Sequence, residues 1–386
     1  MKLELSKRTE WVVRSEIRNM SVECERVDGI NLSQGVVDTE VPPEVRDGAC
    51  RAINSGINTY TRHDGIKQLR EAIAQKAKKF SGLEYDPETE VVVSAGATGA
   101  LYCACLALLN PGDEVIIFEP YYGYHVTTLI ATEVVPKFVR LDPPDWALVR
   151  ADLEKAITKR TRAIIVNTPA NPSGKVFSRQ EIGIIADIAD KRNLFIFTDE
   201  IYEYFIYDGK KHVAPATIPG LRERTITISG LSKTFSITGW RIGYCLCDKK
   251  WAVSIGYFND LVYVCAPAPL QVGVAAGLFG LGQDYYDNLA KTYHIKRDKI
   301  CTALSNSGLK PYVPQGAYYV LADIAGIKGK NSKERAMNIL SKTGVACVPG
   351  EAFYHDDAGE TLARFCFAKD DKVLDEACRR IERCKE

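Results

Sequence analysis

The chain has 386 residues, with 50 lysines and arginines against 49 aspartates and glutamates. At about 150 residues per domain, this length predicts two domains that bury a large core. The net charge of +1 gives no electrostatic footprint for DNA, RNA or an anionic membrane. The longest nearly apolar run, Leu101 to Leu109, is far shorter than the roughly 18 residues of a membrane span. We therefore expect neither nucleic acid nor a membrane as a partner.

The N-terminal segment and the cysteines indicate a cytoplasmic protein. Charges interrupt residues 1–20 throughout, so they lack the apolar core of a secretory signal peptide. Twelve cysteines are scattered along the chain without a CxxC pair. We interpret them as reduced, mostly buried thiols, and we predict no metal site.

Residues 1–35 are typical of a helical arm that ends in an apolar stretch, and helices then alternate with apolar runs. The apolar runs are continuous and do not alternate with polar residues. This pattern predicts strands buried on both faces of a mostly parallel sheet covered by helices, an α/β fold. Helices are expected at 64–80, 99–109 and 179–191, and strands at 91–94, 114–118, 162–167, 194–198, 225–229 and 243–247.

After residue 280 the chain changes to long polar helices and short apolar runs at 318–321, 346–349 and 362–367. This change predicts a second, smaller α+β domain. We expect residues 1–35 to form the arm and part of the small domain, 36–280 the large ligand-binding domain, and 281–386 the small domain.

Ligands of an open α/β sheet bind beyond the carboxyl ends of its strands, so the residues after each strand deserve inspection first. Gly96, Ala97 and Thr98 follow the strand at 91–94 and open a helix. Small residues at a helix N-terminus form a plausible phosphate cradle, although such turns are often only structural. The stretch matches neither GxGxxG nor a Walker motif, which disfavours a dinucleotide site.

Four more polar residues follow later strands: Asn171, Asp199, Lys233 and Arg241. Each has a plain structural alternative, such as a turn cap for Asn171 or a salt bridge for Asp199. A nucleophilic lysine must be neutral, and burial or a nearby cation such as Arg241 lowers its pKa. Together with the cradle, the set fits an aromatic aldehyde that carries a phosphate. The sequence therefore predicts pyridoxal phosphate as the cofactor.

The stretch 232–244, SKTFSITGWRIGY, together with DEIY at 199–202 and NPSG at 171–174, resembles the class I/II aminotransferases. These are pyridoxal-phosphate enzymes of fold type I. The matches run from Gly35 to Arg364. The resemblance implies that Lys233 forms a Schiff base with the cofactor and moves the proton at the substrate's Cα. It implies that Asp199 keeps the pyridine nitrogen protonated, and that Asn171 and Tyr202 bind the phenolic oxygen.

The resemblance also assigns the other contacts of the cofactor. Tyr122 would stack on the pyridine ring. Tyr60 would reach the phosphate from the neighbouring subunit of a homodimer with shared active sites. The phosphate would otherwise be held by Gly96, Ala97, Thr98, Ser232 and Arg241.

The substrate contacts follow in the same way, with two departures from the family pattern. Arg364 would grip the α-carboxylate through its planar fork, with help from Gly35, Tyr122 and Asn171. Gly230 stands where the family often has a phosphate-binding serine, so Ser232 or Ser229 would replace it. The family's GxPDF loop reads GVVDT at 35–39, which indicates an unusual specificity. The family pattern also suggests cis bonds at Glu119–Pro120 and Asn171–Pro172.

The predicted function is exchange of an α-amino group between an amino acid and a 2-oxo acid, by a ping-pong route through pyridoxamine phosphate. The alternative is a lyase or cyclase that uses the same cofactor, because its reaction begins with the same deprotonation. The substrates stay open. Arg62 and His63 are candidates for binding a second carboxylate, whereas a pocket for a large aromatic side chain would use Tyr121, Tyr122, Tyr124 and Tyr263.

Overall fold

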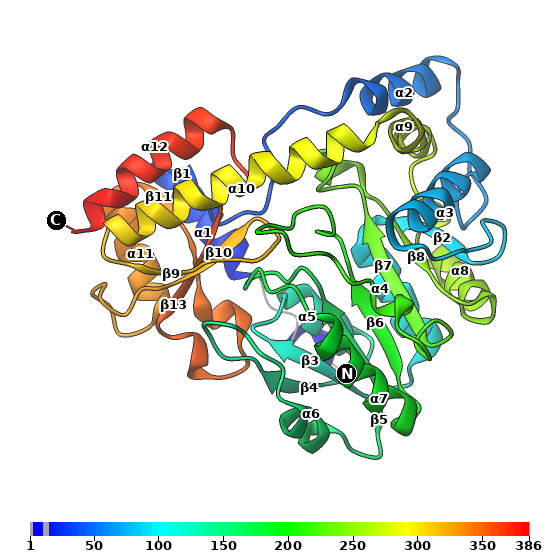
Figure 1. Cartoon of the computed structure of the whole chain (residues 1–386), viewed down its shortest axis with the longest axis horizontal. Coiled ribbons are helices and arrows are strands. Elements are labelled where there is room, and N and C mark those ends of the chain that lie inside the picture. The colour runs from blue at the N-terminus through cyan, green and yellow to red at the C-terminus, as the bar shows by residue number, and fades with distance from the viewer. Residues whose placement is uncertain (1–2, 11–14, 386) are drawn as a thin grey trace.

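The computed structural model describes residues 3–10 and 15–385. A seven-stranded sheet forms its larger part, in the order β2-β8-β7-β6-β5-β3-β4 (Figure 1). All pairs are parallel except those of β8, which runs antiparallel to both neighbours. This confirms the predicted mostly parallel sheet. The strands are β2 (Val91–Ala95), β3 (Glu114–Glu119), β4 (Val135–Arg140), β5 (Thr161–Asn167), β6 (Phe195–Asp199), β7 (Thr225–Gly230) and β8 (Ile242–Leu246).

Helices cover both faces of this sheet, which explains the continuous apolar runs. Along β3, Ile116 packs into one core cluster while Val115 and Ile117 pack into another. The first face is covered by α7 (Arg179–Arg192), and the second by α4 (Gly96–Leu108) and α8 (Lys249–Tyr263). Alternate residues of one strand thus meet two separate layers of helices, and neither face is left to solvent.

Strand β4 was not predicted, and its place in the sheet explains why. It is an edge strand with the sequence VPKFVR, in which Val135 and Arg140 are exposed. Proline is tolerated at a sheet edge because its missing N–H leaves no internal ladder bond unmade. The polar and exposed positions interrupt the apolar run that identified the other strands.

The predicted helix 64–80 starts later than expected, as α3 (Lys67–Ser81). Gly65 has a φ of +100°, which ends the preceding loop and excludes it from the helix. Towards the N-terminus lies α2 (Pro43–Asn54), which packs against α9 (Ala268–Gly280). Two shorter helices, α5 (Gly123–Ala131) and α6 (Arg150–Ala156), flank the strands β3 and β4.

A second, antiparallel sheet has the order β12-β13-β10-β9, and β1 pairs with β11 in a separate parallel ladder. The long helix α10 runs from the end of the large sheet to this second sheet (Figure 1). The elements are β9 (Lys310–Tyr312), β10 (Tyr319–Asp323), β12 (Val348–Pro349), β13 (Leu362–Cys366), β1 (Ile30–Asn31), β11 (Val345–Ala346), α10 (Gln283–Asn306), α11 (Ser332–Thr343) and α12 (Asp371–Ile381).

The run predicted as one strand at 346–349 is two. Ala346 pairs with Asn31, whereas Val348 pairs with Arg364 in the other sheet. Cys347 lies between them and is fully buried. One apolar run therefore serves two ladders.

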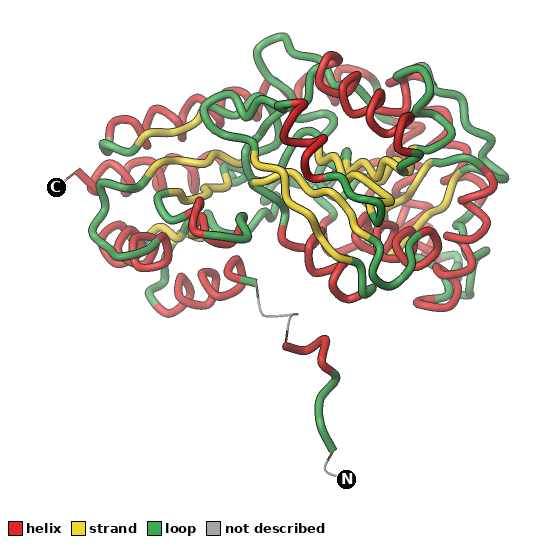
Figure 2. Tube along the Cα trace, turned by 90° about the horizontal axis from the view of Figure 1, so that it is seen from below, coloured by secondary structure: helices red, strands yellow, loops and turns green. Residues whose placement is uncertain are grey.

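The arm consists of a short segment, residues 3–10, that extends away from the body (Figure 2), followed by α1 (Glu16–Arg26). Helix α1 contacts the second sheet through Met20 and Cys24, which are 1% exposed. Part of the predicted arm, residues 1–2 and 11–14, lies outside the described residues. Among the described helices, none is long and apolar enough to cross a membrane.

Candidate active site

A cavity of about 580 Å³ lies between the two sheets, beyond the carboxyl ends of β5, β6 and β7. Its walls come from the large sheet, from β10 and β13 of the second sheet, and from α1. Most of the predicted site residues line it, namely Gly35, Ala97, Thr98, Tyr122, Asn171, Asp199, Tyr202, Ser232, Lys233, Arg241 and Arg364.

Lys233 follows β7 and projects its Nζ into this cavity, where it donates a hydrogen bond to the Gly35 carbonyl at 3.3 Å. Burial lowers the pKa of Lys233 to about 8. The charges of Arg241 and Arg364 act in the same direction, while Cys366 and Asp199 oppose them. A neutral amine is the form that attacks a carbonyl, and this environment makes it accessible near neutral pH.

We expect the cofactor-free protein to take up pyridoxal phosphate with a pH midpoint near 8, because the lowered pKa of Lys233 frees its amine there. An ordinary lysine, with a pKa of 10.5, would place the midpoint more than two units higher. The measurement is the rate of appearance of the visible band against pH. Free lysine with the same cofactor serves as the reference for the cofactor's own titration, and a midpoint near 10 would contradict the expectation.

Asp199 ends β6 and shares its carboxylate with a residue that the sequence analysis missed. His125 Nε2 lies 2.9 Å from Asp199 Oδ2, and both side chains are largely buried. The backbone N–H of Ile201 donates to Oδ1 at 3.3 Å. Carboxylate oxygens accept more than one bond each, so Asp199 keeps capacity for a ligand. The only signal for His125 was its position three residues after Tyr122 at the start of a helix.

Gly96 and Arg241 form a tight corner at the N-terminus of α4. Gly96 has a φ of +76°, and a Cβ there would lie 2.4 Å from Arg241 Nη2. A Cβ on Gly243 would lie 2.3 Å from the Ala97 nitrogen. Two glycines thus allow a guanidinium and unpaired helix N–H groups to approach one point. Such a corner suits a phosphate.

The substitution of glycine for serine at 230 has a steric explanation. A Cβ on Gly230 would lie 3.0 Å from the Ile242 carbonyl oxygen and 3.1 Å from the Gly243 Cα. Ser229 points elsewhere and donates to Glu203 Oε1 at 3.1 Å. Of the two alternatives, only Ser232 is among the residues that line the cavity.

Opposite Lys233, Arg364 is 1% exposed and donates from Nη1 to Asn171 Oδ1 at 2.8 Å. Its Nε is buried and has no hydrogen-bond partner among the described residues. A buried cation with an unused N–H is costly unless a ligand pairs with it. The fork of Arg364 therefore has capacity to bind an anion in the cavity.

Two tyrosine pairs complete the walls. The hydroxyl groups of Tyr202 and Tyr319 lie 3.0 Å apart. The ring of Tyr122 is 5.3 Å from that of Tyr124, at an interplanar angle of 26°. Sequence reasoning missed Tyr319 and several other residues that line the cavity: Ser15, Ile17, Arg18, Gln34, Val36, Thr238 and Gly239.

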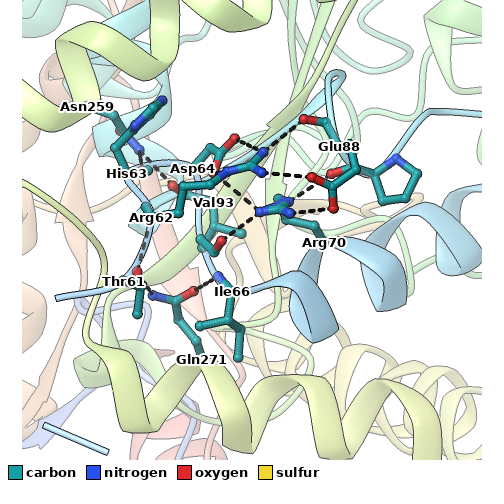
Figure 3. Close-up of polar contacts among 12 residues, drawn as sticks. Thr61, Arg62, His63, Asp64, Ile66, Arg70, Glu88, Val93, Asn259 and Gln271 are labelled. Atoms are coloured by element: carbon teal, nitrogen blue, oxygen red, sulfur yellow. Dashed lines mark hydrogen bonds and ion pairs between the residues drawn. The ribbon is translucent and has the colours of Figure 1, made fainter. Parts of the chain in front are cut away.

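Several predicted residues lie away from the cavity of their own chain. Tyr60 is 82% exposed. The side chain of Arg62 is held by Asp64 and Glu88 (Figure 3). His63 also lies outside the cavity. Tyr121 donates its hydroxyl to the Tyr354 carbonyl at 2.7 Å, and Tyr263 bonds to Asn259.

A buried cluster of Glu200, Glu203 and His212 brings ligand-type atoms within 4.8 Å of one another. Its groups already pair within the protein, because Glu203 bonds to Lys76 and Glu200 to His212 and Thr198. We therefore interpret it as structural. The cis bonds expected at Glu119–Pro120 and Asn171–Pro172 are present, with two more at Pro143–Pro144 and Thr168–Pro169.

Residues 27–381 match the family model described as aminotransferase class I and II. The chain is 34% identical to kynurenine–oxoglutarate transaminase of Dictyostelium discoideum, over 91% of this chain and 90% of that protein. The chain belongs to the class I and II aminotransferases. It is also 34% identical to aromatic-amino-acid aminotransferase 2 of Thermococcus litoralis, over 99% of this chain and 98% of that one. Among solved structures, N-succinyldiaminopimelate aminotransferase from Mycobacterium tuberculosis matches with a TM-score of 0.95 and 35% identity, over 98% and 99% of the two chains.

As a class I and II aminotransferase, the protein uses pyridoxal phosphate and moves an amino group between an amino acid and a 2-oxo acid. The named relatives are transaminases, which supports the predicted aminotransferase and not the lyase or cyclase alternative. The cavity fits the cofactor, since it joins a phosphate corner at Gly96, a carboxylate at Asp199 and a partly neutral lysine. Its fold is that of the fold type I enzymes.

Proposed function

We propose that the residues lining the cavity perform transamination in the roles predicted from the sequence. The observation that carries the proposal is the position of Lys233, whose lowered pKa suits both attack on a carbonyl and proton transfer at the substrate's Cα. Asp199 would hold a proton on the pyridine nitrogen. Asn171 and Tyr202 would bind the phenolic oxygen, and Tyr122 would stack on the ring. Pyridoxal phosphate, when bound, supplies an electron sink for the pair left at Cα.

The phosphate and the substrate's α-carboxylate would bind at opposite ends of the cavity. The phosphate would bind at the corner of Gly96, Ala97 and Thr98, with Ser232 and Arg241 as further donors. The carboxylate would bind to Arg364, which has an unused buried N–H, next to Gly35. This spacing would fix the substrate's Cα beside the Nζ of Lys233, and placing the reacting atoms in this way is itself a large part of catalysis.

The cavity walls favour an amino donor with a large apolar or aromatic side chain. Tyr122, Tyr124, Ile17 and Val36 line it, and together they offer apolar surface beyond the α-carboxylate site. Relatives are named for aromatic amino acids, methionine and kynurenine. We propose that this enzyme also accepts a donor of this class.

We propose glutamate and 2-oxoglutarate as the other substrate pair, with Arg18 as the cation for the distal carboxylate. Arg18 lines the cavity from α1, and its side chain has no hydrogen bond or ion pair with any described residue. This group replaces Arg62, which is paired elsewhere. The same pocket would thus bind both substrates. An aromatic side chain would contact the walls of the pocket, and the distal carboxylate of 2-oxoglutarate would reach Arg18 at its rim.

Replacing Arg18 with alanine is expected to raise the KM for 2-oxoglutarate about 5-fold. This corresponds to roughly 1 kcal/mol, the upper range for an exposed ion pair. The kcat/KM for an uncharged aromatic donor should stay unchanged. Steady-state kinetics with both substrates measure the two effects. Arg26→Ala is the control, because Arg26 lies on the same helix but pairs with Glu23. A uniform loss for both substrates would contradict the role of Arg18.

We also propose a homodimer with shared active sites. The exposed side chains of Val253, Tyr257 and Leu261 lie four residues apart along α8, and together they form an apolar stripe of the kind that marks an interface. The stripe adjoins the loop that carries Tyr60, because the Tyr257 ring centroid lies 6.1 Å from that of His63. We propose that a two-fold dimer formed through this stripe brings Tyr60 to the partner's phosphate corner.

The loop after Tyr60 is held by a dense polar network (Figure 3). Arg62 and Arg70 both bond to Asp64 and Glu88. Two amide side chains, those of Asn259 and Gln271, hold the loop through His63 O, Thr61 Oγ1 and Ile66 N. A loop fixed in this way while its tyrosine stays exposed supports the view that Tyr60 serves another chain.

Two further proposals concern the chain as a whole. We propose domains with the predicted boundaries, 1–35 with 281–386 and 36–280, and the placement of the two sheets supports this division. We propose a cytoplasmic location, supported by the twelve cysteines, all of which are free and ten of which are buried.

A further inference from the structure

We propose that Tyr319 is a positioning residue that holds Arg364 and Tyr202 in their working geometry. The proposal rests on the roles given above to those two residues. Tyr319 lies on β10, in the second sheet, and lines the cavity. Its ring contacts Arg364, which is proposed to bind the substrate's carboxylate. Its hydroxyl contacts Tyr202, which is proposed to bind the cofactor's phenolic oxygen.

The ring of Tyr319 supports the guanidinium of Arg364. The guanidinium carbon lies 4.3 Å from the ring centroid, within the range of a cation–π contact. Leu321, two residues further along β10, is the register partner of Arg364 on β13, so the backbone ladder fixes this stacking. The ring therefore restricts the plane of the fork, while Asn171 fixes its rotation within that plane.

The hydroxyl of Tyr319 lies where it can donate a hydrogen bond to the hydroxyl of Tyr202. The two oxygens lie 3.0 Å apart, and each hydroxyl carries one proton. If Tyr202 donates its proton to the cofactor's phenolic oxygen, then Tyr319 must donate to Tyr202. Burial raises the pKa of Tyr319 to about 12, so it keeps its proton at working pH.

Gly35 makes room for this hydroxyl. A Cβ on Gly35 would lie 1.9 Å from Tyr319 Oη, a distance that excludes any other residue without a shift of the ring. The glycine that begins the unusual GVVDT loop is therefore a steric requirement of the Tyr319 position.

The test removes the hydroxyl and the ring separately. Tyr319→Phe should raise the pKa of the bound cofactor's visible band by about half a unit to one unit, the size of one ordinary hydrogen bond. Without Tyr319 the hydrogen bond from Tyr202 to the negative phenolic oxygen is weaker. This bond stabilises the deprotonated chromophore more than the protonated one, so weakening it raises the pKa. The KM for both substrates should change less than 2-fold in this variant. Tyr319→Leu should in addition raise the KM for every amino and oxo acid, because Arg364 loses its support.

A double variant separates positioning from general damage. In a Tyr202→Phe background, Tyr319→Phe should shift the chromophore pKa no further, since its effect acts through the Tyr202 hydroxyl. Tyr293→Phe is the control, because Tyr293 lies in the same core cluster and its buried hydroxyl bonds to no described residue. It should leave the pKa unchanged.

The outcomes are distinguishable. No shift in Tyr202→Phe itself would overturn the role of Tyr202 and this proposal with it. A shift in Tyr202→Phe but none in Tyr319→Phe would overturn the role of Tyr319 alone, as would equal shifts from Tyr319→Phe in both backgrounds.

Discussion

Asp199→Asn is expected to lower kcat by on the order of 10²- to 10⁴-fold while most of the cofactor stays bound. The asparagine keeps the shape of Asp199 but carries no charge for the pyridine nitrogen. Removing one partner from a buried charged pair costs about 3–5 kcal/mol, and each 1.36 kcal/mol added to a barrier is about tenfold in rate. The phosphate corner and Lys233 would still hold the cofactor.

The measurement compares kcat with the cofactor content of the same protein. Asp199→Glu is the matched control, because it restores the charge at a longer reach, and it should recover part of the loss. His125 lies 2.9 Å from the carboxylate of Asp199, and the longer side chain of glutamate would displace the carboxylate from this contact. Full recovery of the activity is therefore not expected. Near-normal turnover in Asp199→Asn would show that a charge at this position is unnecessary.

Mixing two defective variants is expected to restore activity if the active sites are shared. On the proposed roles, Lys233→Ala would lack the nucleophile, and Tyr60→Ala would lack a phosphate ligand that contributes about 1.5–3 kcal/mol. In a mixed dimer one site collects both defects, while the other combines an intact Lys233 with an intact Tyr60. Random reassociation makes about half of the dimers mixed, so about a quarter of all sites should regain full activity.

The mixed dimer is prepared by unfolding and refolding the two variants together, and a different affinity tag on each chain isolates it. Each variant refolded alone is the control and should stay at its parental activity. If isolated mixed dimers are no more active than the better parent, Tyr60 acts within its own chain or not at all. The side chain of Tyr60 is exposed, which argues against a role within its own chain.

The sequence was most informative where chemistry follows a strand. Asp199 is the last residue of β6, and Lys233 stands three residues beyond the end of β7. These two strands are parallel neighbours, so their carboxyl ends lie side by side. Residues that follow the strands of a parallel sheet gather at the same edge, so the two residues could be predicted to lie close together without knowledge of the strand order. Six strands of the large sheet were recognised for the same reason, since burial on both faces leaves a continuous apolar run.

The residues that sequence reasoning missed depend on how distant segments pack. Arg18 reaches the cavity because α1 lies against the second sheet, and Tyr319 because β10 pairs with β13 beside Arg364. No local pattern contains that information. Gly230 could not be explained from the sequence for a different reason. Only the structure shows that Ile242 and Gly243 lie against it and leave little room for a side chain.

Reduction of the enzyme with borohydride, followed by peptide mapping, tests the central assignment most directly. Borohydride fixes the cofactor permanently to the lysine that holds it, and the label survives digestion. We expect a single labelled peptide that contains Lys233, and no label in Lys233→Ala. Trypsin does not cleave after a modified lysine, so the labelled peptide is TITISGLSKTFSITGWR at 225–241, which its mass identifies. A label on any other lysine would contradict the assignment of Lys233 and the active site built around it.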